Sequence, residues 1–311
     1  MTSLPSWSVV IPVKNGGARL KELLISIQDQ QGVGKPDKIV AVDSGSTDDS
    51  VKILEDFSAE IISIPSEEFK HGPARNLGAG KVSSEVIIFN NQDAVPDNDF
   101  SYRNLINDLM QDETCAGICA TLLPHRDSDP LTERDVLTEF GLMKRGVPVQ
   151  ESDEKRLEKL KNFHTVCCAV RNAVFREIPF RDVIFGEDYH WMRDVRSGGY
   201  FTRVSSARVR HSHNFFPHSI NLLRINADTI YFRRNYENYC LLEFIRSFFY
   251  GILIDLKYLA AKKNLVLWKK MFWIMISPYA RFLQFSGRVL GKYRNKLPQN
   301  IVKNAFYYYR Q

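Results

Sequence analysis

The sequence predicts an α/β domain whose mostly parallel sheet is covered by helices on both faces, followed by a helical, aromatic and basic C-terminal region. Three observations support this prediction. Short apolar runs alternate with segments of helical periodicity through the first half of the 311-residue chain. Polar, glycine-containing clusters follow several of the runs. From about residue 220, aromatic and basic residues are mixed through long helical stretches.

Each element follows from a local pattern. Buried-type strands are predicted at residues 7–13 (WSVVIPV), 38–42 (KIVAV), 60–64 (EIISI) and 85–89 (EVIIF), and later at 116–123, 165–170 and 203–210. Helical spacing predicts helices over 19–30, from a cap at Ser46 or Thr47 to about Phe57, and over 73–81, 102–111 and 186–195.

The charge is unevenly distributed along the chain. The net charge is +6, but residues 240–311 hold 13 Lys/Arg and 2 Asp/Glu, whereas residues 1–239 hold 29 and 34. The basic excess therefore belongs to the C-terminal region, and it is typical of contact with an anionic surface.

Five cysteines with no CxxC pair argue against a disulfide framework or a zinc site, and so favour a reducing compartment. Residues 1–7 do not resemble a signal peptide, and no apolar stretch approaches the length of a spanning helix. We therefore expect a cytoplasmic protein, lying on a membrane surface.

Polar groups follow the predicted strands at the edge where parallel sheets bind ligands. After the second strand, the carboxylate of Asp43 can accept hydrogen bonds from a nucleobase or ribose; the alternative is a helix-capping turn. After the fourth strand, Asp93 can hold Mg²⁺ or Mn²⁺ against a diphosphate; the alternative is a strand-end turn.

Two further segments carry groups suited to catalysis or phosphate binding. Arg75 has a planar fork that matches phosphate oxygens, and His71 either contacts phosphate or caps a turn. Glu187 and Asp188 open a predicted helix, where acids either complement the helix dipole or include a general base.

A pair of histidines follows the last predicted strand. His211 and His213 are spaced so that one of them can reach a metal ion; the alternative is a solvated or core histidine.

The order of these segments resembles family-2 inverting glycosyltransferases with the Rossmann-like GT-A fold. The matching segments are residues 9–15 (VVIPVKN), 39–49 (IVAVDSGSTDD), 69–76 (FKHGPARN), 89–96 (FNNQDAVP) and 185–191 (FGEDYHW). The HGxxRN segment followed by QDAxP is most similar to the bacterial rhamnosyltransferase branch.

The resemblance implies a nucleotide-sugar site at this edge of the sheet. The nucleotide pocket would be lined by Pro12, Val13 and Asp43, with Lys14 and Ser46 nearby.

The resemblance also implies contacts to the donor diphosphate and a metal ion, Mg²⁺ or Mn²⁺. His71, Arg75 and Gln92 would face the donor. Asp93 would bind the metal as the last acid of the family's DxD motif, joined by a late histidine, His213. The motif reads Asn91-Gln92-Asp93 in this chain, so its first acid is missing.

Asp188 matches the family's catalytic base, with Glu187 beside it. The implied reaction is a single displacement: an acceptor hydroxyl, deprotonated by Asp188, attacks the anomeric carbon opposite the nucleotide, and the configuration inverts. A β-linked dTDP-L-rhamnose donor would give an α-linked rhamnose; a UDP-sugar is the other donor considered.

We expect residues 1–219 to form the glycosyltransferase domain and residues 220–311 a helical region. That region would contact anionic membrane on the cytoplasmic face of the inner membrane, since acceptors in this branch are often polyprenyl-linked or other lipid-linked glycans of cell-surface polysaccharide or lipopolysaccharide. The alternative is a packed subdomain or homo-oligomer interface.

Two other functions remain open at this point. One is a non-catalytic nucleotide-sugar-binding scaffold at a membrane, against which the retained Asp188 argues. The other is a nucleotidyltransferase, which would need a longer glycine-rich, basic loop after the first strand. No recognisable nucleic-acid-binding module is found, so nucleic acid is not an expected partner.

Overall fold

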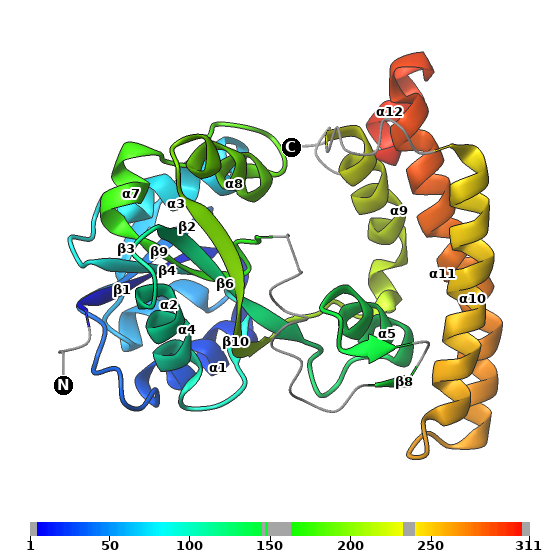
Figure 1. Ribbon diagram of the computed structural model, residues 1–311, viewed down its shortest axis with the longest axis horizontal. Helices are drawn as coiled ribbons and strands as arrows, with labels where there is room; N and C mark the ends of the chain where they lie inside the picture. The colour runs from blue at the N-terminus through cyan, green and yellow to red at the C-terminus, as the bar shows by residue number, and fades with distance from the viewer. Residues whose placement is uncertain (1–4, 145–146, 149–162, 233–239, 307–311) are drawn as a thin grey trace. The chain divides into compact units, whose positions relative to one another are not determined.

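The computed structural model describes residues 5–144, 147–148, 163–232 and 240–306 (Figure 1). The chain forms two compact units, the first made of residues 1–123 and 153–211 and the second of residues 124–152 and 212–311. The predicted division after residue 219 stays a prediction, and helix α9 (Phe215–Phe232) runs through that position.

One eight-stranded sheet organises the first unit, in the order β3-β2-β1-β4-β9-β6-β10-β5. The strands are β1 (Trp7–Val13), β2 (Ile39–Asp43), β3 (Glu60–Ser63), β4 (Val86–Asn90), β5 (Val95–Pro96), β6 (Cys115–Leu123), β9 (Cys167–Arg171) and β10 (Phe201–Arg210). The run from β3 to β4 is parallel, and so is the pair β6–β10. Strand β9 is antiparallel to both its neighbours, and β5 is antiparallel to β10.

Helices cover both faces of this sheet, as the sequence predicted (Figure 1). They are α1 (Gly17–Gln28), α2 (Ser50–Asp56), α3 (His71–Ala79), α4 (Ser101–Met110), α7 (Asn172–Glu177) and α8 (Glu187–Ser197), with a short 3-10 turn η1 (Ser66–Glu68). The α/β prediction is therefore confirmed, with a mixed rather than uniformly parallel sheet.

Alternation along the strands divides the core between the two faces. Val10 and Phe89 pack with the α7 and α8 side chains Phe175 and Trp191 on one face. Helix α3 approaches β1 closely at Gly78, where an added Cβ would lie 2.4 Å from the Val10 side chain. This close packing positions the start of α3, which carries two of the predicted site residues.

The predicted cap at Ser46 or Thr47 is wrong, because α2 begins at Ser50. The local hydrogen bonds explain why the helix begins later than predicted. The Asp43 carboxylate accepts from the Ser46 backbone amide at 3.1 Å, and the Asn15 side chain accepts from the Thr47 amide at 2.8 Å. Residues 43–49 therefore form a turn that the side chains of Asp43 and Asn15 stabilise, and not the first turn of a helix.

The second unit is mainly helical. Its elements are α5 (Pro130–Glu139), the two-residue strands β7 (Met143–Lys144) and β8 (Val147–Pro148), α9, α10 (Leu241–Ala261), α11 (Leu267–Tyr293), η3 (Arg294–Lys296) and α12 (Gln299–Ala305). Gly287 and Gly291 bring α11 against α9, since a Cβ on either would lie within 2.3 Å of an α9 carbonyl oxygen. The predicted C-terminal helical region is thus confirmed.

A buried charge cluster joins three helices of the second unit; we call it the Asp255 cluster. Asp255 on α10 is fully buried and accepts from Arg281 Nε on α11 at 2.7 Å and from Arg134 Nε on α5 at 2.6 Å. Asp135 accepts from Arg281 Nη1 at 2.9 Å, and the Ser277 hydroxyl also donates to Asp255. All three nitrogens of each arginine have partners.

None of the helices within the described ranges is long and apolar enough to cross a bilayer.

Candidate functional site

The ends of β1 and β4 are tied together by a side-chain amide. Gln92, two residues beyond β4, donates from Nε2 to the Lys14 carbonyl at 2.9 Å and accepts from the Lys14 amide at the same distance. This contact fixes the ends of β1 and β4, and β2 lies on the other side of β1 in the sheet.

The turn after β2 is organised by Asp43. Its buried carboxylate accepts from the Gly45 amide at 3.1 Å and from the amide and hydroxyl of Ser46. The Ser46 hydroxyl in turn accepts from the Asn15 amide at 2.9 Å. The structure therefore brings Asp43 and Ser46 together beside the end of β1, and hydrogen bonds of the turn occupy both carboxylate oxygens.

The other predicted nucleotide-pocket residues lie on or just beyond β1. Pro12 and Val13 are buried in the strand, and Val13 pairs in register with Asp43. Lys14 is exposed, and its ammonium group contacts the Ser66 hydroxyl. The structure thus gathers Pro12, Val13, Lys14 and Asp43 at adjacent strand ends.

A buried ion pair connects α3 with α8; we call its network the Arg75 cluster. Arg75, which is 1% exposed, donates from Nη1 to Glu187 Oε1 at 3.0 Å and from Nη2 to Asn91 Oδ1 at 2.8 Å. Thr165 donates to the same Glu187 oxygen at 2.9 Å. Arg75 Nε is buried and has no partner among the described residues. A contact between Arg75 Nη1 or Nη2 and a phosphate would require one of the present acceptors to give way.

The protonation of this cluster follows from burial and charge. Burial, aided by the Arg75 charge, lowers the pKa of His71 to about 4, although Glu187 opposes the shift. Burial alone would raise the pKa of Glu187, but the charge of Arg75 and the Thr165 hydrogen bond lower it overall. At neutral pH the cluster therefore holds an ionised Glu187 and a neutral His71 beside Arg75.

Asp188 follows Glu187 in the first turn of α8. Gly186 precedes the helix at φ +76°, a conformation that glycine adopts readily. The Asp188 side chain is half-buried, and its Oδ1 accepts from the Tyr189 amide at 2.7 Å. A carboxylate can accept a proton, which is the chemistry a general base needs.

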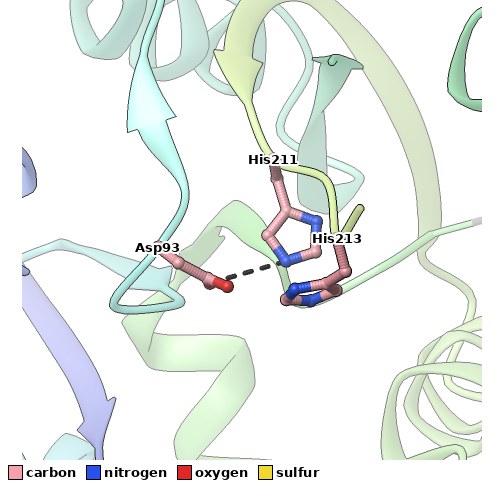
Figure 2. A group of neighbouring side chains, drawn as sticks. All are labelled: Asp93, His211 and His213. Atoms are coloured by element: carbon pink, nitrogen blue, oxygen red, sulfur yellow. Dashed lines mark ion pairs between the residues drawn. The ribbon is translucent and has the colours of Figure 1, made fainter. Parts of the chain in front are cut away.

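Figure 2 shows a potential metal site formed by Asp93, His211 and His213. His211 Nε2 lies 3.5 Å from Asp93 Oδ1, and the ligand atoms of the three side chains lie within 4.8 Å of one another. One carboxylate oxygen and two imidazole nitrogens suit Mn²⁺ and similar divalent ions, whereas Mg²⁺ prefers oxygen ligands. The residues therefore fit a divalent metal, and the donor set favours Mn²⁺.

Sequence reasoning missed the supporting residues of these groups. Thr165 and Asn91 bond to the Arg75 cluster, but neither stands in a local pattern that indicates such a role. The sequence prediction placed His213 beside Asp93 on the metal and left His211 out. The structure brings both imidazoles to Asp93.

The chain matches one protein-family model, described as glycosyl transferase family 2, over residues 8–184. It is 28% identical over 297 residues to the O-antigen chain rhamnosyltransferase RfbN of Salmonella typhimurium, covering 94% of this chain and 91% of that protein. It is 27% identical to the O-antigen chain rhamnosyltransferase WbaN of Salmonella anatum, covering 95% and 92% of the two chains.

Among solved structures, the chain resembles the mannosyltransferase PcManGT of Pyrobaculum calidifontis, determined in complex with GDP-Man and Mn²⁺. The TM-score is 0.61 at 14% identity, covering 94% of this chain and 88% of that one. At this identity the similarity shows a shared fold.

Proposed function

The chain belongs to glycosyl transferase family 2, and from this membership we propose that it is an inverting, metal-assisted glycosyltransferase that passes L-rhamnose to a hydroxyl of a glycan. That the protein is a nucleotide-sugar-dependent glycosyltransferase follows from the family. The sugar, the acceptor and the roles of individual residues are the proposal.

One observation carries the assignment of roles. Asn91, bonded to Arg75, stands two residues before Asp93; Glu187, bonded to the same guanidinium, stands one residue before Asp188. A single buried arginine thus holds the segment bearing the proposed metal ligand against the segment bearing the proposed base. Catalysis by positioning needs this kind of fixed separation between the group that takes the proton and the group that binds the leaving diphosphate.

In the proposed reaction, Asp188 takes the proton of the acceptor hydroxyl. The hydroxyl oxygen forms a bond to the anomeric carbon while the bond from that carbon to the nucleotide diphosphate breaks, and attack from the opposite face inverts the configuration. Asp93, His211 and His213 would hold a divalent ion, which supplies positive charge to offset the charge on the leaving diphosphate.

We assign the nucleotide contacts to Pro12, Val13, Asp43, Ser46 and Lys14, at the ends of β1 and β2. The gathering of these side chains at one edge of the sheet supports the assignment.

Arg75, His71 and Gln92 stay proposed contacts on the diphosphate side. Gln92 supports this side of the site by joining the loops that follow β1 and β4. Arg75 would reach a phosphate directly only by exchanging one of its present acceptors.

The donor proposal, dTDP-L-rhamnose rather than a UDP-sugar, rests on the two rhamnosyltransferases that the chain resembles over most of its length. We likewise propose an acceptor of the lipid-linked glycan type used in lipopolysaccharide O-antigen synthesis. The catalytic part would then work on the cytoplasmic face of the inner membrane, with the C-terminal helices contacting anionic lipid or a second copy.

Substitution of Asp188 tests the proposal. We expect Asp188→Asn to lower transfer from dTDP-L-rhamnose by roughly 10²–10⁴-fold, because a general base contributes about that much, while donor binding and the unfolding midpoint stay near wild type. Asp194→Asn is a matched control on the same helix, since Asp194 pairs with Arg181 near the surface. Normal turnover by Asp188→Asn would refute the base assignment, and turnover with another nucleotide sugar alone would refute the donor.

A further inference from the structure

An exposed apolar stripe runs along α11. Trp268, Phe272, Met275, Tyr279 and Phe282 follow one another at spacings of four, three, four and three residues, which places them on one side of the helix. Between 44% and 75% of each residue is exposed. We call these five residues the α11 stripe. Isolated exposed apolar residues are ordinary, but five large ones in line are not.

The neighbouring helix α10 carries a second line of exposed apolar residues. Leu242, Phe249, Leu253 and Leu256 are spaced by seven, four and three residues and are 37% to 64% exposed. Figure 1 shows α10 and α11 side by side, joined by a short connection. The hairpin therefore presents apolar side chains along both of its helices.

The core of the second unit is built mainly from other side chains; within the α11 stripe, the Tyr279 ring packs edge-on against the buried Phe215. Other sides of the two helices hold the Asp255 cluster and the buried residues Ile254, Leu259, Ala280 and Leu283. Because other residues of α10 and α11 make the interior contacts, the exposed apolar side chains can contact a partner outside the unit.

The charge around the apolar lines is positive. Arg246, Lys257 and Lys269 are exposed on the hairpin, and the chain has no acidic residue after Asp255. Asp255 itself is buried in its ion pairs. The only exposed acid on α10 and α11 is Glu243, at the start of α10, where it accepts from the Cys240 amide.

We propose that the α11 stripe and its α10 neighbours lie in the surface of an anionic lipid bilayer, with the helices parallel to the membrane plane. Aromatic side chains and flanking basic residues are the composition of interfacial helices. Neither helix can cross the bilayer, so it is the surface that they meet. Two copies meeting at this face would bring like charges together, which opposes self-association.

This inference deepens the membrane partner proposed above and names the residues that make the contact. It is tested without donor or acceptor, so a failure of the rhamnosyltransferase assignment leaves it standing, and the converse also holds.

The experiment measures co-sedimentation of the full chain with vesicles. We expect binding to vesicles of equal phosphatidylcholine and phosphatidylglycerol, and much weaker binding to phosphatidylcholine alone. The variant Phe272→Ser, Met275→Ser, Phe282→Ser should lower the partition coefficient by roughly tenfold or more, because it removes three apolar side chains from the contact. A matched control, Ile25→Ser, Leu77→Ser, Phe100→Ser, removes three exposed apolar side chains of the first unit and should bind like wild type.

A second variant tests the charge and does not depend on the first. The variant Arg246→Gln, Lys257→Gln, Lys269→Gln should weaken binding to the phosphatidylglycerol vesicles, by about fivefold for each charge removed. High salt should have the same effect.

Two results would overturn the proposal. One is wild-type binding equal to that of both variants. The other is a vesicle-free dimer, seen by sedimentation equilibrium, that the serine variant converts to a monomer, since the stripe would then be covered by a second copy. Thermal unfolding of each variant is measured alongside, and an unchanged midpoint excludes loss of fold as the cause of weaker binding.

Discussion

Each unit of this protein buries an arginine against a carboxylate, but the two clusters are built differently. In the Asp255 cluster, the arginine nitrogens are all bonded, and the pKa of Arg281 is raised by Asp135 and Asp255 against the effect of burial. In the Arg75 cluster, one guanidinium nitrogen has no partner among the described residues, and a neutral histidine lies close by. Glu187 is followed in the chain by a second carboxylate, the half-buried Asp188, whereas the neighbours of Asp255 in the chain are apolar.

A buried ion pair alone therefore does not identify a functional site. A cluster whose arginine nitrogens are all bonded is saturated: its polar groups fix the packing of the helices and are fully used in doing so. An unsaturated cluster at the end of strands retains capacity to bind or to position a reacting group. Substitutions in the two clusters should therefore differ in what they impair.

The largest effect is expected in the saturated cluster. Asp255→Asn leaves the two buried arginines, Arg134 and Arg281, with Asp135 as the one anion between them, and removing one partner of a buried pair costs about 3–5 kcal/mol. We expect the free energy of unfolding to fall by that amount in urea denaturation. Transfer per folded molecule should be nearly unchanged.

Asp182→Asn serves as the control, because Asp182 is exposed and pairs with Lys70 at the surface. Equal destabilisation by both substitutions would contradict the importance assigned to the Asp255 cluster.

Glu187→Gln should show the opposite pattern. The substituted glutamine side chain can still accept from Arg75 and Thr165, and Arg75 keeps Asn91 as an acceptor, so we expect a loss of stability of only about 1–3 kcal/mol. Turnover should fall roughly tenfold to hundredfold, because Asp188 would no longer be held in place. Steady-state kinetics with a separate measurement of donor affinity distinguish the two effects. A variant that loses stability but keeps wild-type kcat would make the Arg75 cluster purely structural.

Between pH 7.5 and pH 5, acidification should act on the Arg75 cluster and not on the Asp255 cluster, because the Asp255 cluster contains no histidine. The folded pKa of His71 is about 4, against 6.5 for an unperturbed histidine. Between these values the unfolded chain binds a proton that the folded chain does not, so this stability is complete above pH 6.5 and is lost as the pH falls towards 4. Wild type should therefore lose about 1–2 kcal/mol more than His71→Gln between pH 7.5 and pH 5.

The same burial effect lowers the pKa of His164 to about 4. His164 is present in both proteins, so its share cancels in the comparison. Equal losses in wild type and His71→Gln would show that His71 does not titrate in this range.

The smallest effect concerns a carboxylate that belongs to neither buried cluster. Asp93→Ala removes the oxygen ligand beside His211 and His213, and we expect nucleotide-sugar affinity in Mn²⁺ to fall roughly tenfold. EDTA should weaken wild type and leave the variant unchanged. Asp99→Ala is the control, since Asp99 lies outside this group. Identical affinities for wild type and Asp93→Ala, with and without EDTA, would remove Asp93 from the metal site.

Local sequence patterns predicted most of the first unit. Strand β1 spans the predicted residues 7–13, and β4 is displaced by one residue from 85–89. Such strands are buried throughout, so they leave uninterrupted apolar runs in the sequence. The antiparallel insertion of β9 between β4 and β6 was not predictable in this way, because strand partners far apart in the chain leave no local signal.

The Arg75 and Asp255 clusters could not be predicted from local sequence patterns either, because their members are far apart in the chain. Arg75 and Glu187 are 112 residues apart, and each was assigned a different task from its own segment. Arg134, Asp255 and Arg281 are charged residues on helices, which usually face water. Only the packing of α5, α10 and α11 shows that they meet.

The hydrogen bond between Asn91 and Arg75 gives a reason why position 91 holds an asparagine and not the first acid of the DxD motif. Arg75 carries one positive charge, and Glu187 already matches it. An aspartate at position 91 would place a second anion on the same guanidinium in a buried setting, whereas asparagine offers the same acceptor oxygen without charge. The charge of Arg75 can therefore compensate one negative charge in total at positions 91 and 187. A chain that regained the acid at 91 would be expected to lose it at 187, so the two sites should change together.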